Sequence, residues 1–113
     1  MLAIPAIDLA AKAVDIGSCS GSDTDKFKTF DLTPVKAKSV TAPLIAECLA
    51  NIECRVKDYI DTYSIFVLEA VHAWIDTKRK ERRTFHANGD GTFIVGGRTL
   101  NLRKRMLKLP PGV

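Results

Sequence analysis

The stretch Asn51-Ile52-Glu53-Cys54-Arg55-Val56-Lys57 alternates strictly between polar and apolar side chains. Successive side chains of a β-strand point to opposite faces, so this period of two predicts a half-buried strand. Ile52, Cys54 and Val56 are expected on its core face, and the four polar residues on the other face. The stretch therefore indicates a protein built around a sheet.

The segment from Tyr63 to Ile75 follows after a short connection and is apolar in both of its alternating rows. Such a run predicts a strand that is covered on both faces, and we interpret it as the central strand. A helix is the competing interpretation because the segment is long. Its β-branched and aromatic residues, and the Asp61-Thr62 turn before it, favour the strand.

Shorter elements flank these two strands. Apolar residues at helical spacing predict a helix over Ile7 to Val14, which Gly17 ends. Near the other end, Gly96-Gly97 joins Thr92–Val95 to Arg98–Leu102, which predicts a two-residue hairpin. The fold class that we expect is mainly β with short helices.

Length and composition limit the possibilities further. A chain of 113 residues with 46% hydrophobic and 27% charged residues is one globular domain, here assigned to residues 1–109 with a tail at 110–113. No apolar run is long enough to span a bilayer, and no signal peptide pattern is present. We therefore expect a cytoplasmic protein with no membrane partner.

Cysteines and basic residues exclude further classes. The three cysteines leave one unpaired in any connectivity and lack zinc or iron–sulfur spacing, so reduced thiols and no metal are expected. The net charge is +4, with basic residues concentrated in Lys78–Arg83 and Arg98–Lys108. Neither cluster is accompanied by stacking aromatics or a DNA-binding motif, so nucleic acid is not the expected partner.

The segment from Gly17 to Phe27 reads Gly-Ser-Cys-Ser-Gly-Ser-Asp-Thr-Asp-Lys-Phe. Its small residues allow an anionic ligand to approach backbone N–H groups, and its hydroxyls add donors. Ser22 and Asp25 have the spacing of a capping box that would start a short helix, with Lys26 adding a positive charge. The alternative is a polar loop followed by a surface helix with an ordinary solvated lysine.

Several motifs together resemble the flavin reductase family of the flavoredoxin type. In order, they are Gly17 to Phe27, Leu32-Thr33-Pro34-Val35, Ala42 to Cys48, Glu53-Cys54-Arg55-Val56, Phe66-Val67-Leu68-Glu69 and Gly89-Asp90-Gly91-Thr92-Phe93. The resemblance extends from about Leu2 to about Met106. It corresponds only to the second half of the family's domain.

The resemblance implies an FMN-binding split β-barrel that pairs as a homodimer. Because the family's N-terminal strands have no counterpart here, we expect a partial barrel and a truncated sequence. The implied reaction is NAD(P)H-dependent flavin reduction or electron transfer through bound FMN. The alternative is a truncated, non-catalytic remnant that associates through exposed strand edges, either as a homodimer or with a missing N-terminal half.

The resemblance also implies cofactor-binding residues. Lys26 matches the lysine of the family's flavin site, and Ser20, Gly21 and Asp25 match its loop. Tyr63 stands where many relatives carry a histidine that contacts flavin or the nicotinamide donor, and His86 lies in the segment before the Gly-Asp-Gly turn. No residue is assigned a catalytic role, because flavin itself carries out hydride and electron chemistry.

Overall fold

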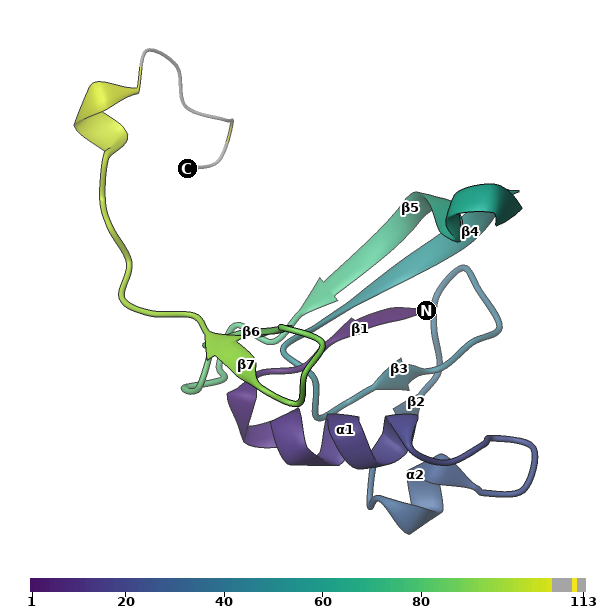
Figure 1. Cartoon of the computed structure of the whole chain (residues 1–113). Coiled ribbons are helices and arrows are strands. Elements are labelled where there is room, and N and C mark those ends of the chain that lie inside the picture. The colour runs from purple at the N-terminus through teal and green to yellow at the C-terminus, as the bar shows by residue number, and fades with distance from the viewer. Residues whose placement is uncertain (107–110, 112–113) are drawn as a thin grey trace.

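The strands of this protein form three antiparallel sheets in a computed structural model that describes residues 1–106 and 111 (Figure 1). The largest sheet has the order β1-β4-β5, from β1 (Leu2–Ile4), β4 (Ala50–Ile60) and β5 (Ile65–Ile75). Two smaller sheets pair β2 (Pro34–Val35) with β3 (Leu44–Ile45), and β6 (Phe85–Ala87) with β7 (Phe93–Val95). Within the described residues these sheets do not close into a barrel.

Helices are few and short. A 3-10 turn at Ile7–Leu9 leads into α1 (Ala10–Gly17), and α2 (Lys26–Thr29) follows the loop between them. Further 3-10 turns span Asp61–Tyr63 and Arg103–Arg105. The expectation of a mainly β fold with short helices is confirmed. The expected tail at 110–113 lies outside the described residues except for Pro111.

The centre of the main sheet is β4, so the prediction that β5 is the central strand is wrong. β5 pairs with β4 from Ile65 opposite Ile60 to Ile75 opposite Ala50, while β1 pairs with only the first residues of β4. β5 is thus an edge strand of the described sheet. Its apolar side chains on both faces were the basis of the prediction, but most of them are exposed.

The buried face of β4 is also opposite to the one predicted from its alternation. Asn51 and Glu53 have exposed fractions of 5% and 0%, whereas Val56 is 62% exposed. A bulge between Glu53 and Cys54 then changes the register with β5. Buried polar groups must be hydrogen-bonded, and the partners of these two come from outside β4.

Glu53 fastens the loop after β2 to the sheet. Its carboxylate accepts hydrogen bonds from the Lys38 N–H (3.0 Å), the Ser39 N–H (2.6 Å) and the Trp74 indole N–H (2.7 Å). Burial alone would raise the pKa of Glu53, but these three hydrogen bonds lower it from 4.5 to about 2. Glu53 is therefore a buried structural anion.

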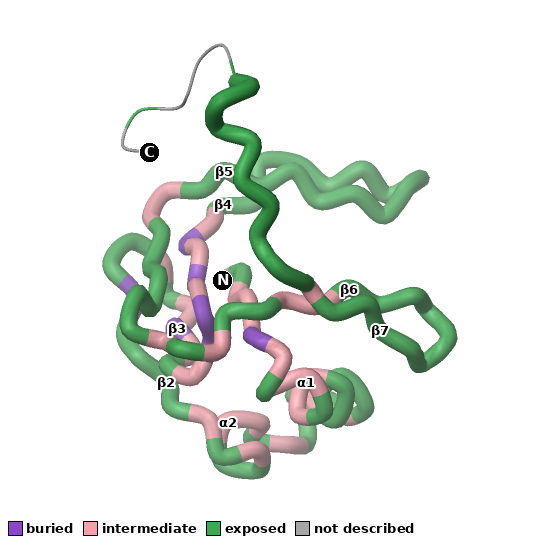
Figure 2. The backbone as a smooth tube through the Cα atoms, turned by 90° about the vertical axis from the view of Figure 1, so that its left-hand side faces the viewer, coloured by how far each residue is buried: buried purple, intermediate pink, exposed green. Residues whose placement is uncertain are grey.

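Asn51 holds β3 in a similar way. Its side-chain oxygen accepts from the Ile45 N–H and its side-chain nitrogen donates to the Ile45 carbonyl, both at 3.0 Å. The pair of bonds copies a strand ladder contact. Buried residues gather around the first half of β4 and the turn before it, and the outer half of the β4–β5 hairpin is exposed (Figure 2).

The C-terminal hairpin differs from the prediction. β7 pairs with β6, Phe93 lying opposite Ala87, across a turn that contains Gly89 and Gly91 at φ +90°. Gly96 then donates to the Thr84 carbonyl at 2.7 Å and continues this pairing, so the predicted hairpin with Arg98–Leu102 is wrong. The Asn-Gly-Asp-Gly turn, with its two positive-φ glycines, determines the pairing.

Candidate functional site

The loop over residues 17–25 is fastened to the end of α1. It carries three of the predicted site residues, and the fourth, Lys26, follows it as the first residue of α2. Ser18 donates its N–H to the Asp15 carbonyl and its hydroxyl to the Val14 carbonyl, both at 3.0 Å. Lys26 Nζ donates to the Ile16 carbonyl at 2.9 Å. These contacts satisfy carbonyls that a helix end leaves without partners, and the ammonium also suits the negative end of the helix dipole.

Lys26 therefore does not extend freely into solvent. It is partly buried and closes the loop over residues 17–25 by joining its two ends. An ammonium group has three donors, and one of them is used by Ile16. The other two donors have no hydrogen-bond partner among the described residues.

The tip of this loop presents donors to solvent. Ser20 and Ser22 hydroxyls are bonded to each other at 2.7 Å, and the Ser20 carbonyl accepts from the Thr24 N–H at 3.1 Å. The Gly21 N–H donates to no described residue, and a Cβ built on Gly21 meets nothing within 4 Å. The space above this backbone is open to a ligand.

Asp25 begins α2. Its carboxylate accepts from the Lys28 N–H at 3.3 Å, which makes Asp25 the N-cap of the helix. The predicted capping box that starts at Ser22 is thus wrong, because Ser22 bonds to Ser20 instead. Asp25 also lines an open cavity of about 580 Å³ beside Phe27 and Leu32.

The structure places Tyr63 and His86 away from this loop. Tyr63, 73% exposed, lies in the turn at the far end of the β4–β5 hairpin, while α2 lies at the opposite side of the molecule in both views (Figures 1 and 2). His86 is an exposed residue of β6, opposite Ile94. One copy of the described chain therefore brings Ser20, Gly21, Asp25 and Lys26 together, and leaves Tyr63 and His86 apart from them.

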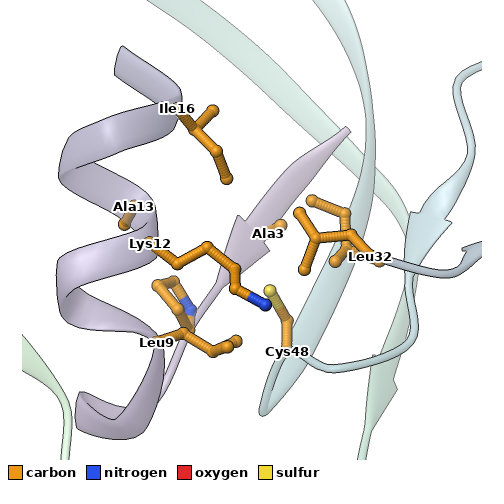
Figure 3. A pocket seen from close by; sticks show the side chains of 9 residues that line it. Ala3, Leu9, Lys12, Ala13, Ile16, Leu32 and Cys48 are labelled. Atoms are coloured by element: carbon orange, nitrogen blue, oxygen red, sulfur yellow. The ribbon is translucent and has the colours of Figure 1, made fainter. Parts of the chain in front are cut away.

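A separate cavity lies between α1 and the strands. It measures about 240 Å³, and the side chains of Leu9, Lys12, Ile16 and Cys48 line it. In Figure 3 the Lys12 ammonium and the Cys48 thiol point toward each other across this space. Burial raises the pKa of the Cys48 thiol, so it stays protonated near neutral pH.

Sequence reasoning did not single out Lys12. The spacing of Leu9, Lys12, Ala13 and Ile16 follows the i, i+3, i+4, i+7 pattern of one helix face. A single lysine in such an apolar row was the signal for a charged residue facing the cavity.

None of the helices among the described residues has the length and apolar character needed to cross a bilayer. No group of three or more His, Cys, Asp or Glu side chains in this part of the chain is arranged to hold a metal ion.

A comparison of the sequence with known families covers most of the strands and the glycine-serine loop between the two short helices. The sequence model of the flavin reductase like domain matches residues 2–93. The chain belongs to this family. The resemblance seen in the sequence motifs is thereby confirmed.

Individual relatives extend this assignment. An uncharacterized protein of Archaeoglobus fulgidus is 38% identical over 74 residues, which cover 64% of this chain and 42% of that protein. The uncharacterized protein YddH of Escherichia coli K12 is 28% identical over 111 residues, covering 86% of this chain and 59% of its own length. The chain thus spans about half the length of the curated relatives that it matches.

Solved structures show the same fold. Flavoredoxin of Desulfovibrio vulgaris (Miyazaki F) superimposes with a TM-score of 0.76 at 25% identity, covering 88% of this chain and 59% of flavoredoxin. An FMN-binding domain of a flavin reductase-like enzyme from Shewanella baltica OS155 gives a TM-score of 0.74 at 21% identity, covering 88% and 60%. The partial split-barrel fold expected from the sequence agrees with both neighbours.

Proposed function

We propose that this chain forms part of an FMN-binding unit of the flavin reductase type. The observation that carries the proposal is the loop over residues 17–25, whose open backbone and hydroxyl donors lie within the matched family region. The printed description of the Shewanella neighbour as FMN-binding supports it.

The residues at the loop fit a phosphate group. The Gly21 N–H has no partner among the described residues, and the Ser20 and Ser22 hydroxyls can turn from each other toward an acceptor. Lys26 adds a positive charge held at one end of the loop. Asp25 helps indirectly, because its carboxylate is engaged in capping α2.

Bound FMN supplies hydride and electron chemistry, with NAD(P)H as the proposed donor. In this proposal the chain's own contribution is to bind the phosphate through the Gly21 N–H, the Ser20 and Ser22 hydroxyls and Lys26. Tyr63 and His86 lie apart from the loop within one chain, so they join the site only if a second chain completes it. We therefore include a homodimer, or an assembly with the other half of the family's domain, in the proposal.

Titration of the protein with FMN, followed by quenching of flavin fluorescence, tests the proposal. Lys26→Ala is expected to weaken FMN binding about tenfold or more, because it removes a charge-assisted hydrogen bond. Lys28→Ala is the matched control, since Lys28 belongs to the same short helix and its side chain is exposed. If flavin fluorescence is not quenched even at high micromolar protein, the proposal is contradicted.

Riboflavin separates binding of phosphate from loss of structure. Riboflavin lacks the phosphate, so Lys26→Ala should lower the affinity for riboflavin less than it lowers the affinity for FMN. A thermal unfolding curve for each variant shows whether the loop closure by Lys26 also stabilises the fold. Equal losses for FMN and riboflavin, with an unchanged melting temperature, would remove Lys26 from the phosphate site.

A second candidate function, association with another chain, is favoured by the edges of the main sheet. β1 pairs with β4 only as far as Ile52, so the outer half of β4 has an unpaired edge on that side among the described residues. The apolar side chains of Phe66 and Val56 are exposed nearby. Such edges promote association, as expected of a non-catalytic remnant. Light scattering that shows only a monomer would exclude this alternative.

A further inference from the structure

The loop that follows β5 is held rigid by its own arginines. Arg79 Nη1 donates to the Glu47 carbonyl at 2.9 Å, and its other terminal nitrogen pairs with Asp8. Arg82 donates to the Asp76 carbonyl at 2.8 Å. These contacts connect the loop to the 3-10 turn before α1, to the turn before β4 and to the residue that follows β5.

The next arginine in this loop is also engaged. Arg83 makes two hydrogen bonds to the Glu81 carboxylate, at 2.8 and 3.0 Å, and its carbonyl accepts from the Ile7 N–H at 2.9 Å. The Glu81 charge is thus neutralised by Arg83. The backbone near residue 83 is fixed to the rest of the fold.

A second segment, residues 96–99, lies against this loop. Gly96 donates to the Thr84 carbonyl at 2.7 Å, and a Cβ on Gly96 would meet that oxygen at 3.3 Å. The absence of a side chain at Gly96 permits this close approach. Beyond the contact the two segments separate and enclose an open cavity of about 520 Å³.

The cavity carries an excess of positive charge. Lys80, Arg82, Arg83 and Arg98 line it, together with the single carboxylate of Glu81. Lys80 and Arg98, one from each segment, form no hydrogen bond or ion pair with any described residue. Thr84, which carries a hydroxyl, also lines the cavity. Two unpaired cations facing one space, with a hydroxyl donor, suit a compact ligand of high negative charge.

We propose that this basic cavity, bounded by the 80–84 and 96–99 segments, binds the phosphate of a small phosphorylated molecule, with Lys80 and Arg98 as its principal contacts. The volume accommodates a phosphate and an attached group, within the range of small-molecule sites. The site is separate from the loop at residues 17–25, and it does not depend on FMN binding there. A free phosphate compound and the phosphate of a nucleotide share this chemistry.

Calorimetric titration with pyrophosphate at about 50 mM salt tests the site, because phosphate contacts are strongest at low salt. The Lys80→Ala, Arg98→Ala double variant should lose at least about tenfold in affinity. The Lys36→Ala, Arg55→Ala double variant removes the same charge from exposed positions outside the cavity and should lose less than about twofold.

Three results overturn the proposal. One is no pyrophosphate binding by the unaltered protein, and a second is an equal loss in the two double variants, which would reduce the effect to net charge. The third is that a single-stranded oligonucleotide binds far more tightly than pyrophosphate and that both double variants weaken its binding equally. Comparison of pyrophosphate with ADP distinguishes the sources, since stronger ADP binding that also requires Lys80 and Arg98 supports a nucleotide phosphate.

Discussion

Replacement of Asn51 by alanine should loosen the attachment of β3 to the main sheet. The Asn51 side chain makes two hydrogen bonds of 3.0 Å to the Ile45 backbone and is almost completely buried. At about 0.5 to 1.5 kcal/mol for each bond, Asn51→Ala should lower the free energy of unfolding by about 1 to 3 kcal/mol. For a domain of this size the melting temperature should then fall by about 5 to 20 °C.

Urea unfolding, followed by the fluorescence of Trp74, measures this change. Asn101→Ala is the control, because the exposed Asn101 side chain accepts a single bond from the Arg103 N–H. Its effect should stay within about 0.5 kcal/mol. A loss for Asn51→Ala no larger than that for Asn101→Ala would refute the reasoning.

Asn51→Asp examines the donor separately. The new carboxylate could still accept from the Ile45 N–H, but its second oxygen would face the Ile45 carbonyl without a proton. Burial and this repulsion favour the protonated form, so the pKa of the introduced group should be raised in the folded state. The penalty is then present at neutral pH and decreases as the pH falls through that raised pKa.

Three further predictions concern other buried or constrained positions. The folded-state pKa of Glu53 is lowered to about 2 from 4.5, so its stabilisation is complete above pH 4.5 and should be lost as the pH falls toward 2. An acid titration of Trp74 fluorescence measures this loss, and Glu53→Gln should abolish that part of the pH dependence. Gly89→Ala, at φ +90°, should destabilise the β6–β7 hairpin by about 1 to 2 kcal/mol; faster hydrogen exchange there, but not at Ile52, is the expected sign. Cys48 should react with iodoacetamide more slowly than Cys19, because burial raises its thiol pKa; peptide mass spectrometry that finds Cys48 modified first would contradict this.

The elements that the sequence predicted well depend on neighbours along the chain. The helix at the N-terminus, its end at Gly17 and the long alternating strand are local patterns, and all are present. The buried face of that strand could not be read in the same way. Glu53 is buried because Lys38, Ser39 and Trp74 supply its donors, from 14 to 21 residues away. A period of two identifies two faces, but distant hydrogen-bond donors determine which of them is buried.

In the candidate site, too, local features could be predicted from the sequence and contacts between distant residues could not. The loop over residues 17–25 was predictable because its glycines, its serines and Lys26 lie within one short segment. The hydrogen bond from Lys26 to the Ile16 carbonyl joins residues ten positions apart in the sequence, so it depends on the turn between the helices. The separation of Tyr63 from this loop follows from the length of the β4–β5 hairpin, which carries the turn away from the helices.

On the proposed function, the exposed β4–β5 hairpin should couple FMN binding to the association of chains. β5 is apolar on both faces, and Phe66, 60% exposed, stacks on Tyr59 with ring centroids 4.5 Å apart. A second chain that covered these rings would also fix Tyr63, at the same end of the hairpin, relative to a flavin site. On the proposed function, FMN affinity should therefore rise with the fraction of associated protein. A dilution series in which flavin quenching and light scattering are measured on the same samples should show both signals falling together. Tight FMN binding by a monomer would separate the two, and would leave the loop of residues 17–25 sufficient for the cofactor.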